Sequence, residues 1–437
     1  MKHVLTSAGI LALGAASLQA LDPEMTRQQT GRPFSVAATV RGFYDDNVNT
    51  SPDKIVTASG VIHPRQDSFG FEVSPSAHLN LPMEQTFISL GYVYSLKWYQ
   101  DRDPDIDQSH EFSAKLRHQF SPKHQIGVDD SFVLTSEPTV VDRFGIVTAP
   151  VRTRSSVFHN VGSIEDNIGL TQLIGLSFGY VNSWYDYEAD GAGSRSALLD
   201  RIEHSIRGDV RYQFTPKLVG LVGYTFGFST FTGDEPILSP GDQQAAIDSG
   251  LSARKAHQKS NIRDSYSHYI YVGTDYDLTA QLRASVRVGA QITDFHRVSE
   301  TSISPYADAS LTYVYLPGDS VEVGVRHARN ATDIGKIDGK GNPTLDAETT
   351  AAYLQLNHQI THALTASFIG QYQISSFNDG ASDGEDEALA LLGVNLGYRI
   401  NRHWSTEFGY NYDWLMSDLK GREYDRNRVY IGVRAQY

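Results

Sequence analysis

The sequence predicts an all-β protein, a transmembrane antiparallel up-and-down β-barrel of about 18 strands, with 16 as the alternative number. Three observations support this fold class. They are the side-chain pattern of the last strand, an apolar segment at the start of the chain, and a regular alternation of short and long polar connections. Together they indicate the outer membrane of a Gram-negative-type bacterium, which barrel strands cross.

The last strand shows the pattern most clearly. Residues 429–437 place an apolar or aromatic side chain at each odd position and end the chain on Tyr437. Successive side chains of a strand point to opposite faces, so this pattern predicts one face toward lipid and the other toward a wet lumen. We expect residues 34–437 to form the barrel, with this strand pairing with Phe34, Val36 and Val40 and Tyr437 recognised by the barrel assembly machinery.

The start of the chain predicts export. A short polar start with Lys2 precedes an apolar run at 4–18 that is too short to span a bilayer, and Ala20 is small enough for a cleavage position. Residues 1–20 are therefore predicted to be a cleaved signal peptide, followed by a short periplasmic segment at 21–33. The alternative is a buried helix of the mature protein.

Composition limits the class of protein. The 437 residues contain no second long apolar run and no Cys, and the mean hydropathy is −0.34. A barrel has this property because lipid-facing and lumen-facing residues alternate along each strand. The formal net charge of −14 argues against a nucleic-acid partner. Nothing in the sequence indicates a cofactor.

Short turns and longer polar segments alternate along the chain. The short turns recur about every forty residues, and residues 120–123 and 214–217 are close copies with Pro at the third position. The short turns are expected in the periplasm and the long segments outside, and their count predicts 18 strands with both ends in the periplasm. The longer segments lie at 45–66, 101–108, 137–154, 189–199, 232–264, 297–302, 330–347, 378–387 and 418–425.

The strands between these connections alternate as a membrane barrel requires. In 282–290, for example, Leu282, Val286 and Val288 alternate with polar residues that include Arg283 and Arg287. A soluble β-solenoid or sandwich would share this alternation. It would not require aromatic belts or an aromatic residue at the terminus.

Inward-facing charges are the candidate functional residues. Opposite charges on neighbouring strands can pair across the wall, which is a structural role, or they can form a charged constriction that selects ions or sugars. The dense cluster on 201–211, with Arg283 and Arg287 near it, is where we expect the constriction. The predicted pore-lining residues are Lys97, Lys115, Arg117, Arg201, Glu203, Arg207, Asp209, Arg211, Arg283, Arg287, Glu322 and Arg326.

The segment 232–264 is the longest connection. A loop of this length either folds into the lumen as a constriction or extends outside, and 243–251 is compatible with a short helix.

Other chemical motifs are weak. The acidic residues at 101–107 resemble a calcium loop, but Ile106 stands where the turn requires Gly and Phe112 where the bidentate Glu belongs, so no metal site is predicted. The sequence has no G-x-S-x-G or H-E-x-x-H motif, and no enzyme is predicted.

One local motif carries a family resemblance. Residues 44–48, Tyr-Asp-Asp-Asn-Val, at the end of the first predicted strand, resemble the corresponding segment of the second family of outer-membrane β-barrel porins. The resemblance implies a passive outer-membrane channel. Relatives linked to exopolysaccharide production make a glycan a candidate passenger.

We therefore expect a porin through which small hydrophilic solutes or saccharides diffuse. In the membrane its neighbours would be outer-membrane lipid and lipopolysaccharide. Luminal Tyr269, Tyr271 and Tyr306 are candidates for stacking on sugar rings. The alternatives are a barrel enzyme acting on lipid and a plugged structural or adhesive barrel. The sequence leaves the solute and the oligomeric state open.

Overall fold

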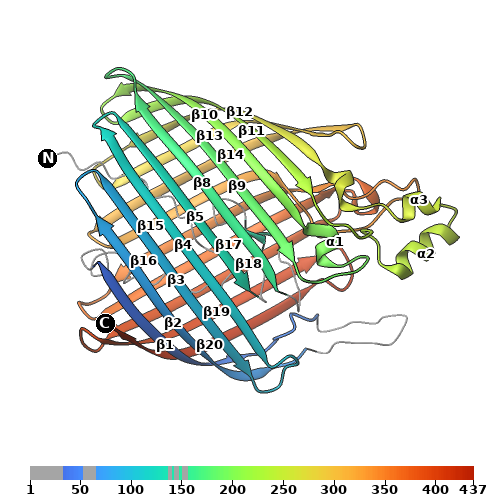
Figure 1. Cartoon of the computed structure of the whole chain (residues 1–437), viewed down its shortest axis with the longest axis horizontal. Coiled ribbons are helices and arrows are strands. Elements are labelled where there is room, and N and C mark those ends of the chain that lie inside the picture. Colours follow the sequence, from blue (N-terminus) through green and yellow to red (C-terminus); the bar gives the residue numbers. More distant parts are fainter. Residues whose placement is uncertain (1–32, 53–64, 136–139, 142–146, 150–155) are drawn as a thin grey trace.

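The computed structural model describes residues 33–52, 65–135, 140–141, 147–149 and 156–437. These residues form a closed antiparallel barrel of 18 strands, in which each strand pairs with its neighbours along the chain and β1 pairs with β20 (Figure 1). The predicted fold class and the predicted strand number are both confirmed.

The strands are 12 to 17 residues long, which suits tilted membrane crossings. The barrel strands are β1 Phe34–Asp45, β2 Ser68–Pro82, β3 Thr86–Tyr99, β4 Ile106–Ser121, β5 His124–Thr135, β8 Val157–Gly169, β9 Ile174–Tyr187, β10 Arg201–Thr215, β11 Leu218–Phe231, β12 Ser265–Asp277, β13 Leu282–Phe295, β14 Glu300–Leu316, β15 Asp319–Asn330, β16 Asp346–Gln359, β17 Leu364–Asn378, β18 Asp386–Arg399, β19 Trp404–Ser417 and β20 Tyr424–Gln436. A separate two-stranded sheet is formed by β6 Val140–Val141 and β7 Val147–Ala149.

The first and last strands close the barrel. Val40 lies opposite Val433 in the register, and the backbone groups of Val36 and Tyr437 exchange two hydrogen bonds of 3.2 and 2.9 Å. The Tyr437 side chain is exposed on the outer face and its ring lies parallel to that of His403. The pairing expected from the sequence is therefore present at Val36 and Val40, whereas Phe34 lies beyond the end of β20 and opposite Leu79 of β2. Among the described residues, no barrel strand has an open edge.

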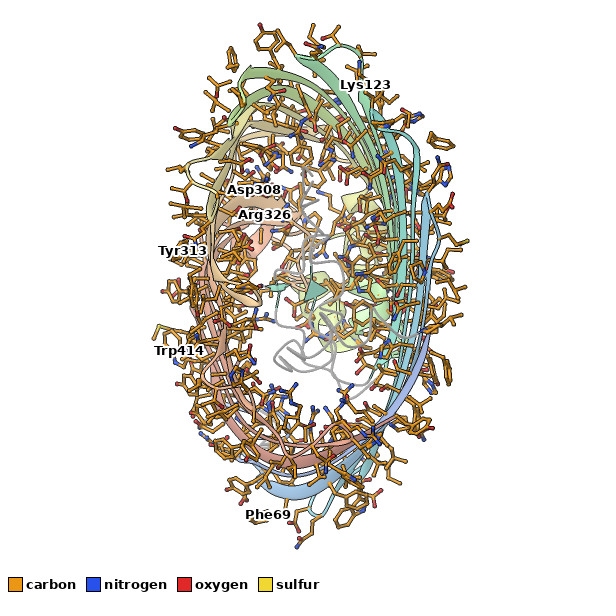
Figure 2. The ribbon with its side chains drawn as sticks, turned by 90° about the vertical axis from the view of Figure 1, so that its left-hand side faces the viewer. Phe69, Lys123, Asp308, Tyr313, Arg326 and Trp414 are labelled. Atoms are coloured by element: carbon orange, nitrogen blue, oxygen red, sulfur yellow. The ribbon has the colours of Figure 1, made fainter. Side chains whose placement is uncertain are left out.

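The alternation of side chains separates two faces of the wall. Phe69, Tyr313 and Trp414 point outward, whereas Asp308 and Arg326 point into the lumen (Figure 2). The outer face carries many exposed large apolar side chains, among them Val222, Ile270 and Ile431. This is the arrangement that a lipid environment requires of the outer face.

The outer face is not wholly apolar, which the sequence pattern did not predict. Asp130, Asn160, Asn182 and His204 alternate with inward-facing residues and therefore point outward. They pair among themselves: the Asn160 amide donates to Asp130 at 3.3 Å, and Asn182 lies 3.2 Å from His204. Hydrogen bonding between outward polar groups reduces the cost of placing them in an apolar surrounding.

Short turns and long loops lie at opposite ends of the barrel. We call these the turn end, where the C terminus lies, and the loop end, where the helices lie (Figure 1). The hairpin between β14 and β15 shows how tight the turns are: Gly318 has φ of 99°, a conformation that glycine adopts without strain. The alternation of connections expected from the sequence is present.

The helices belong to the loop end. They are α1 Arg195–Leu199, α2 Pro240–Asp248 and α3 Ala253–Ala256, with 3₁₀ turns at Ser260–Arg263 and Gly380–Ser382. The predicted helix at 243–251 is present in part as α2. It begins earlier, at Pro240, because Ser239 caps it, and it ends earlier, at Asp248. No helix in the described parts of the chain is long and apolar enough to cross a membrane.

The loop 232–264 combines the two arrangements considered from the sequence. Ile237 and Leu238 pack with Leu198 and Leu199 against the inward-facing rings of Tyr185 and Tyr187, so this part turns into the mouth. Helix α2 has no buried residue. Apolar contacts with the rim therefore hold the loop at the mouth.

Several predicted segments fall outside the described residues. These are the signal peptide at 1–20, all but the last residue of the periplasmic segment at 21–33, and most of the predicted loops at 45–66 and 137–154. The signal peptide and its cleavage therefore stay predictions.

The two-faced wall predicts a depth-dependent cost for charge on the outer face. Val288 lies near the middle of β13 and is half exposed on the outer face, so Val288→Arg should lower the free energy of unfolding by about 2–4 kcal/mol. Leu282→Arg, on the same face at the turn end of the same strand, should cost about 0–1 kcal/mol. Urea unfolding in phospholipid vesicles measures both values, and equal costs would contradict a lipid-facing wall.

Candidate functional site

The inner face of the barrel wall carries all twelve predicted pore-lining residues. The register places them at alternate positions whose cross-strand partners also point inward, as in the pairs Glu72–Lys97, Lys115–Asp129 and Asp308–Arg326. Seven of the twelve lie on β10 and β13, which β11 and β12 separate, and the others are spread over β3, β4 and β15. The structure therefore divides the predicted set into separate groups.

The first group is a band of charged residues on β8–β13, which we call the charge band. Arg211 and Arg287 both contact the carboxylate of Asp275, at 2.6 and 3.4 Å, and the hydroxyl of Ser285 donates to the same carboxylate. Arg283 pairs with Asp277 at 2.7 Å. Two guanidinium groups thus share one carboxylate, which concentrates positive charge on one part of the wall.

The charge band continues with Arg207. Its guanidinium lies 3.5 Å from Asp209 and 3.4 Å from Glu165 on β8. Asp209 also accepts a hydrogen bond of 2.6 Å from the hydroxyl of Tyr271. The side of the band at Arg207 is therefore richer in carboxylates, and the side at Arg211 is richer in guanidinium groups.

A second group lies on β3 and β4. Arg117 donates to both oxygens of Asp129, at 2.9 and 2.8 Å. Lys115, which faces Asp129 in the register, makes no ion pair with any described residue. Lys97 lies between Glu72 and Asp107 in the register. Lys115 therefore adds a free positive charge to this wall.

The remaining strand residues lie on β15. Glu322 accepts a hydrogen bond of 3.3 Å from the hydroxyl of Tyr353, and Arg326 lies opposite Asp308 in the register. Arg41 of β1, which also faces the lumen, contacts both Glu72 and Glu407. Much of the wall charge is thus paired across strands, as the structural interpretation of the sequence expected.

Arg201 and Glu203 belong to the mouth rather than to the charge band. Arg201 is 2% exposed and pairs with Glu203 at 2.7 Å. Its guanidinium carbon lies 3.8 Å from the ring centroid of Tyr185, a cation–π contact. The cluster that the sequence predicts on 201–211 is therefore split between two depths of the barrel.

Four side chains from different loops and strands form an ion-pair network at the mouth. Arg422 donates to Asp333 at 3.0 Å and to Glu387 at 2.8 Å, and Arg195 also pairs with Asp333. Burial alone would raise the pKa of Asp333, but Arg422 and Arg195 hold that pKa well below its usual range. The network therefore joins the loops after β9, β15 and β19 in the ionised state.

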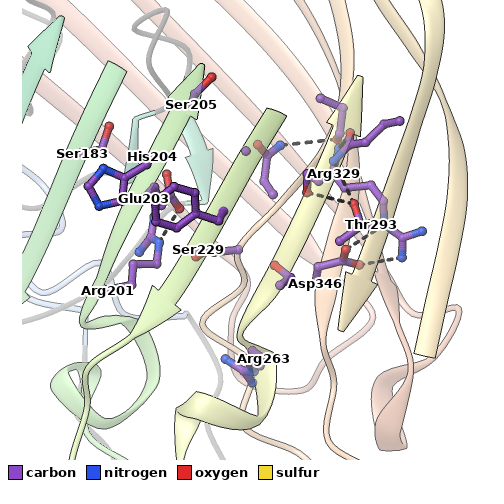
Figure 3. A pocket seen from close by; sticks show the side chains of 18 of the residues that line it. Ser183, Arg201, Glu203, His204, Ser205, Ser229, Arg263, Thr293, Arg329 and Asp346 are labelled. Carbon is purple, nitrogen blue, oxygen red and sulfur yellow. Dashed lines mark hydrogen bonds and ion pairs between the residues drawn. The ribbon is translucent and has the colours of Figure 1, made fainter. Parts of the chain in front are cut away.

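The mouth also contains a recess of about 180 Å³ below the loops, between β9–β13 and the loop-end parts of β15 and β16. Arg201 and Glu203 lie on one side, Arg329 and Asp346 on the other, and Arg263 between them (Figure 3). Arg326 also lines the recess. Aromatic and apolar residues such as Phe228, Phe295 and Leu345 also line the recess. Hydroxyl and amide side chains contribute as well: Ser183, Ser205, Ser229, Ser265, Ser267, Tyr269, Gln291, Thr293 and Asn330.

The sequence did not predict the contributions of Arg263, Arg329, Asp333, Asp346 and Arg422. All five lie in loops or at the loop ends of strands, where the alternation of side chains gives no information. Asp333 and Arg422 are 89 residues apart, and no spacing rule connects them. Within the described residues, no group of three or more His, Cys, Asp or Glu side chains is arranged to hold a metal ion.

Comparison with known proteins gives one family match. Residues 251–437 match the model of the family described as Putative beta-barrel porin 2. The match covers less than half of the chain, from the loop before β12 to the last strand. It confirms the resemblance predicted from the sequence, and with the closed barrel it indicates an outer-membrane protein of a Gram-negative-type bacterium.

Solved structures resemble the barrel at low sequence identity. OpdQ of Pseudomonas aeruginosa is 12% identical, with a TM-score of 0.42 over 92% of this chain and 97% of that chain. The siderophore receptor PirA of Pseudomonas aeruginosa is 12% identical, with a TM-score of 0.42 over 92% and 80%. OccAB4 of Acinetobacter baumannii is 10% identical, with a TM-score of 0.41 over 93% and 99%. A comparison with curated protein sequences finds no match.

The mouth network predicts a pH-dependent stability. Asp333→Asn should destabilise the closed loops by about 3–5 kcal/mol at pH 7, because Arg195 and Arg422 lose a buried carboxylate. The contribution of a carboxylate with a lowered pKa is present above its unfolded pKa of about 3.9 and is lost as the pH falls through the folded value. Hydrogen exchange of backbone amides in 331–345 should therefore show a constant difference from pH 7 to about pH 4, and a smaller one below.

Asp234→Asn is the matched control for this prediction. Asp234 is an exposed mouth carboxylate whose only recorded partner within the described residues is Lys259, at 3.6 Å. This change should leave the hydrogen exchange of the backbone amides in 331–345 unchanged, since exposed ion pairs contribute little to stability. Equal protection in wild type and Asp333→Asn would show that the network does not hold the loops.

Proposed function

We propose that this chain, whose residues 251–437 match the Putative beta-barrel porin 2 family, is an outer-membrane porin through which small hydrophilic solutes diffuse passively. The closed barrel supports this proposal most directly, because its outer face is largely apolar and its inner face carries the charge band. A wall with this polarity keeps its polar groups away from lipid and presents them to an aqueous lumen.

The charges of the wall support an electrostatic role in selection. Arg211 and Arg287 share Asp275, and Lys115 makes no ion pair with a described residue, so positive charge is available on two sides of the lumen. In a confined lumen such groups act on a passing ion more strongly than exposed surface charges do, because less water screens them. We propose that these cations favour anions over cations of similar size.

Saccharide passage is the second candidate function. Tyr269 lines the recess beside Ser265 and Ser267, and this combination of an aromatic ring and hydroxyl groups suits a sugar. Tyr271 and Tyr306 are only 4% and 5% exposed, because they pack with Leu221 and Ala328. A stacking role therefore falls to Tyr269 alone among the three tyrosines considered from the sequence.

Reconstitution in a planar lipid bilayer tests the channel. A porin should insert with stepwise increases in conductance, and a sealed barrel would instead support the plugged structural or adhesive class. An enzyme acting on lipid would release fatty acid from the same bilayer lipid, and its turnover would depend on one Ser or His at the rim. The assay therefore separates the three classes on one preparation.

Charge reversal tests the charge band within a conducting barrel. Arg207→Glu combined with Arg211→Glu should shift the reversal potential toward cations under a salt gradient, because two inward positive charges become negative. Single-channel conductance should change by less than about twofold, since the lumen width is kept. Lys123→Glu, in the short turn between β4 and β5, is the matched control and should keep the wild-type potential. An unchanged reversal potential in the double variant would show that the charge band does not determine the ion selectivity.

A further inference from the structure

The recess at the mouth carries more positive than negative charge. Four arginines line it, Arg201, Arg263, Arg326 and Arg329, together with two carboxylates, Glu203 and Asp346. Glu203 pairs with Arg201, and Asp346 accepts from Arg329 at 2.7 and 2.8 Å. Each of the two carboxylates that line the recess therefore forms an ion pair with an arginine of the same lining.

Arg263 is the most unusual of these side chains. It is fully buried, and among the described residues it donates only to neutral backbone carbonyl groups, those of Leu198, Thr332 and Ile334. Its Nε has no hydrogen-bond partner among the described residues. A buried guanidinium without a carboxylate is costly, so this site gains stability when an anion lies beside it.

The neighbouring carboxylates compensate the charge of Arg263 only in part. Asp333 and Asp346 both act on it electrostatically, but Asp333 pairs with Arg195 and Arg422, and Asp346 pairs with Arg329. Burial lowers the pKa of Arg263 to about 10, and the side chain is still charged at neutral pH. The positive charge at the base of the recess is thus maintained under physiological conditions.

The rest of the lining is uncharged, and part of it forms hydrogen bonds while part is apolar, as at Phe228 and Phe295. Ser229, Ser265, Ser267 and Thr293 present hydroxyl groups, and Tyr269 adds a ring and a phenol. The volume of about 180 Å³ exceeds the about 10–15 Å³ that one water needs on the same measure, so there is room for a small solute. Such a lining matches a ligand that carries hydroxyl groups as well as negative charge.

We propose that the recess is a binding site for a small hydroxylated oxyanion, held by Arg326 at its charged group and by the hydroxyl side chains around it, with the buried positive charge of Arg263 attracting it electrostatically. The site lies at the loop end of the barrel wall, so binding there would raise the local concentration of such anions at this end of the lumen. The inference deepens the proposed porin function and rests on it.

The test uses the full chain, with inorganic phosphate, glucuronate and glucose as probes. Phosphate and glucuronate share the oxyanion, and glucuronate and glucose share the sugar hydroxyls. Each probe is added to open channels in a planar bilayer, where block of the chloride current reports binding. Each is also added to the protein in detergent, where a ligand of the folded state raises the unfolding temperature whether or not the barrel conducts.

We expect glucuronate to block the current and raise the unfolding temperature at lower concentration than phosphate does, and glucose to do neither. Arg326→Gln should weaken both effects of glucuronate by about tenfold, as expected for the loss of a charge-assisted hydrogen bond. Arg326 lies within β15, so this change leaves the carbonyl contacts of Arg263 in place. Arg297→Gln is the control, because Arg297 pairs with Asp264 at the mouth but does not line the recess.

The outcomes separate the two proposals. A conducting barrel on which neither oxyanion has any effect would overturn the binding site and leave the porin proposal intact. Equal effects of glucose and glucuronate, or equal weakening by Arg297→Gln and Arg326→Gln, would also overturn it. A barrel without conductance whose unfolding temperature rises with glucuronate, and does so less in Arg326→Gln, would contradict the porin and support the site.

Discussion

The rest of the structure depends on one constraint, which is that every backbone donor and acceptor within the hydrocarbon must be paired. A closed antiparallel ladder satisfies this constraint, and the pairing of β1 with β20 completes it. Once the ladder is closed, side chains can only point outward or inward, in strict alternation. The chemistry of the lumen is therefore set by every second residue of each strand, and the stability of the wall does not require those residues to be apolar.

This alternation explains why so much of the barrel could be predicted from the sequence. The face of each pore-lining candidate follows from its position parity, as it does for Arg207 and Arg211 on β10 or Arg283 and Arg287 on β13. Parity gives no information on the pairing between these side chains. Arg211 reaches Asp275 two strands away, across Leu221, because the register and the length of the guanidinium side chain allow it. Arg201 is separated from the charge band because it lies at a different depth in the barrel, and the parity of a position indicates only its face.

The mouth was beyond sequence prediction for a different reason. Loops have no periodicity, and their contacts join residues that are far apart in the chain, as Asp333 and Arg422 are. The helix α2 was expected at 243–251, and its capped start at Ser239 and Pro240 was a local signal that this prediction did not use. Arg263 has no comparable signal, since its role depends on carbonyl groups at 198, 332 and 334. The outward polar pair Asp130 and Asn160 was missed because each residue is compatible with a strand and only their register shows the contact.

The distribution of charge along the barrel follows from the difference between the strands, whose side chains alternate, and the loops, which have no periodicity. On the strands, guanidinium groups meet carboxylates from neighbouring strands, and the charge band contains as many carboxylates as arginines. At the mouth, loops bring in arginines whose partners are carbonyl groups or carboxylates that are already shared. Side chains are buried where the loops pack on Tyr185 and Tyr187, so less water screens an unbalanced charge there than in the open lumen. The sign of the charge at the mouth should therefore influence which solutes enter more strongly than the mixed charges of the wall below it.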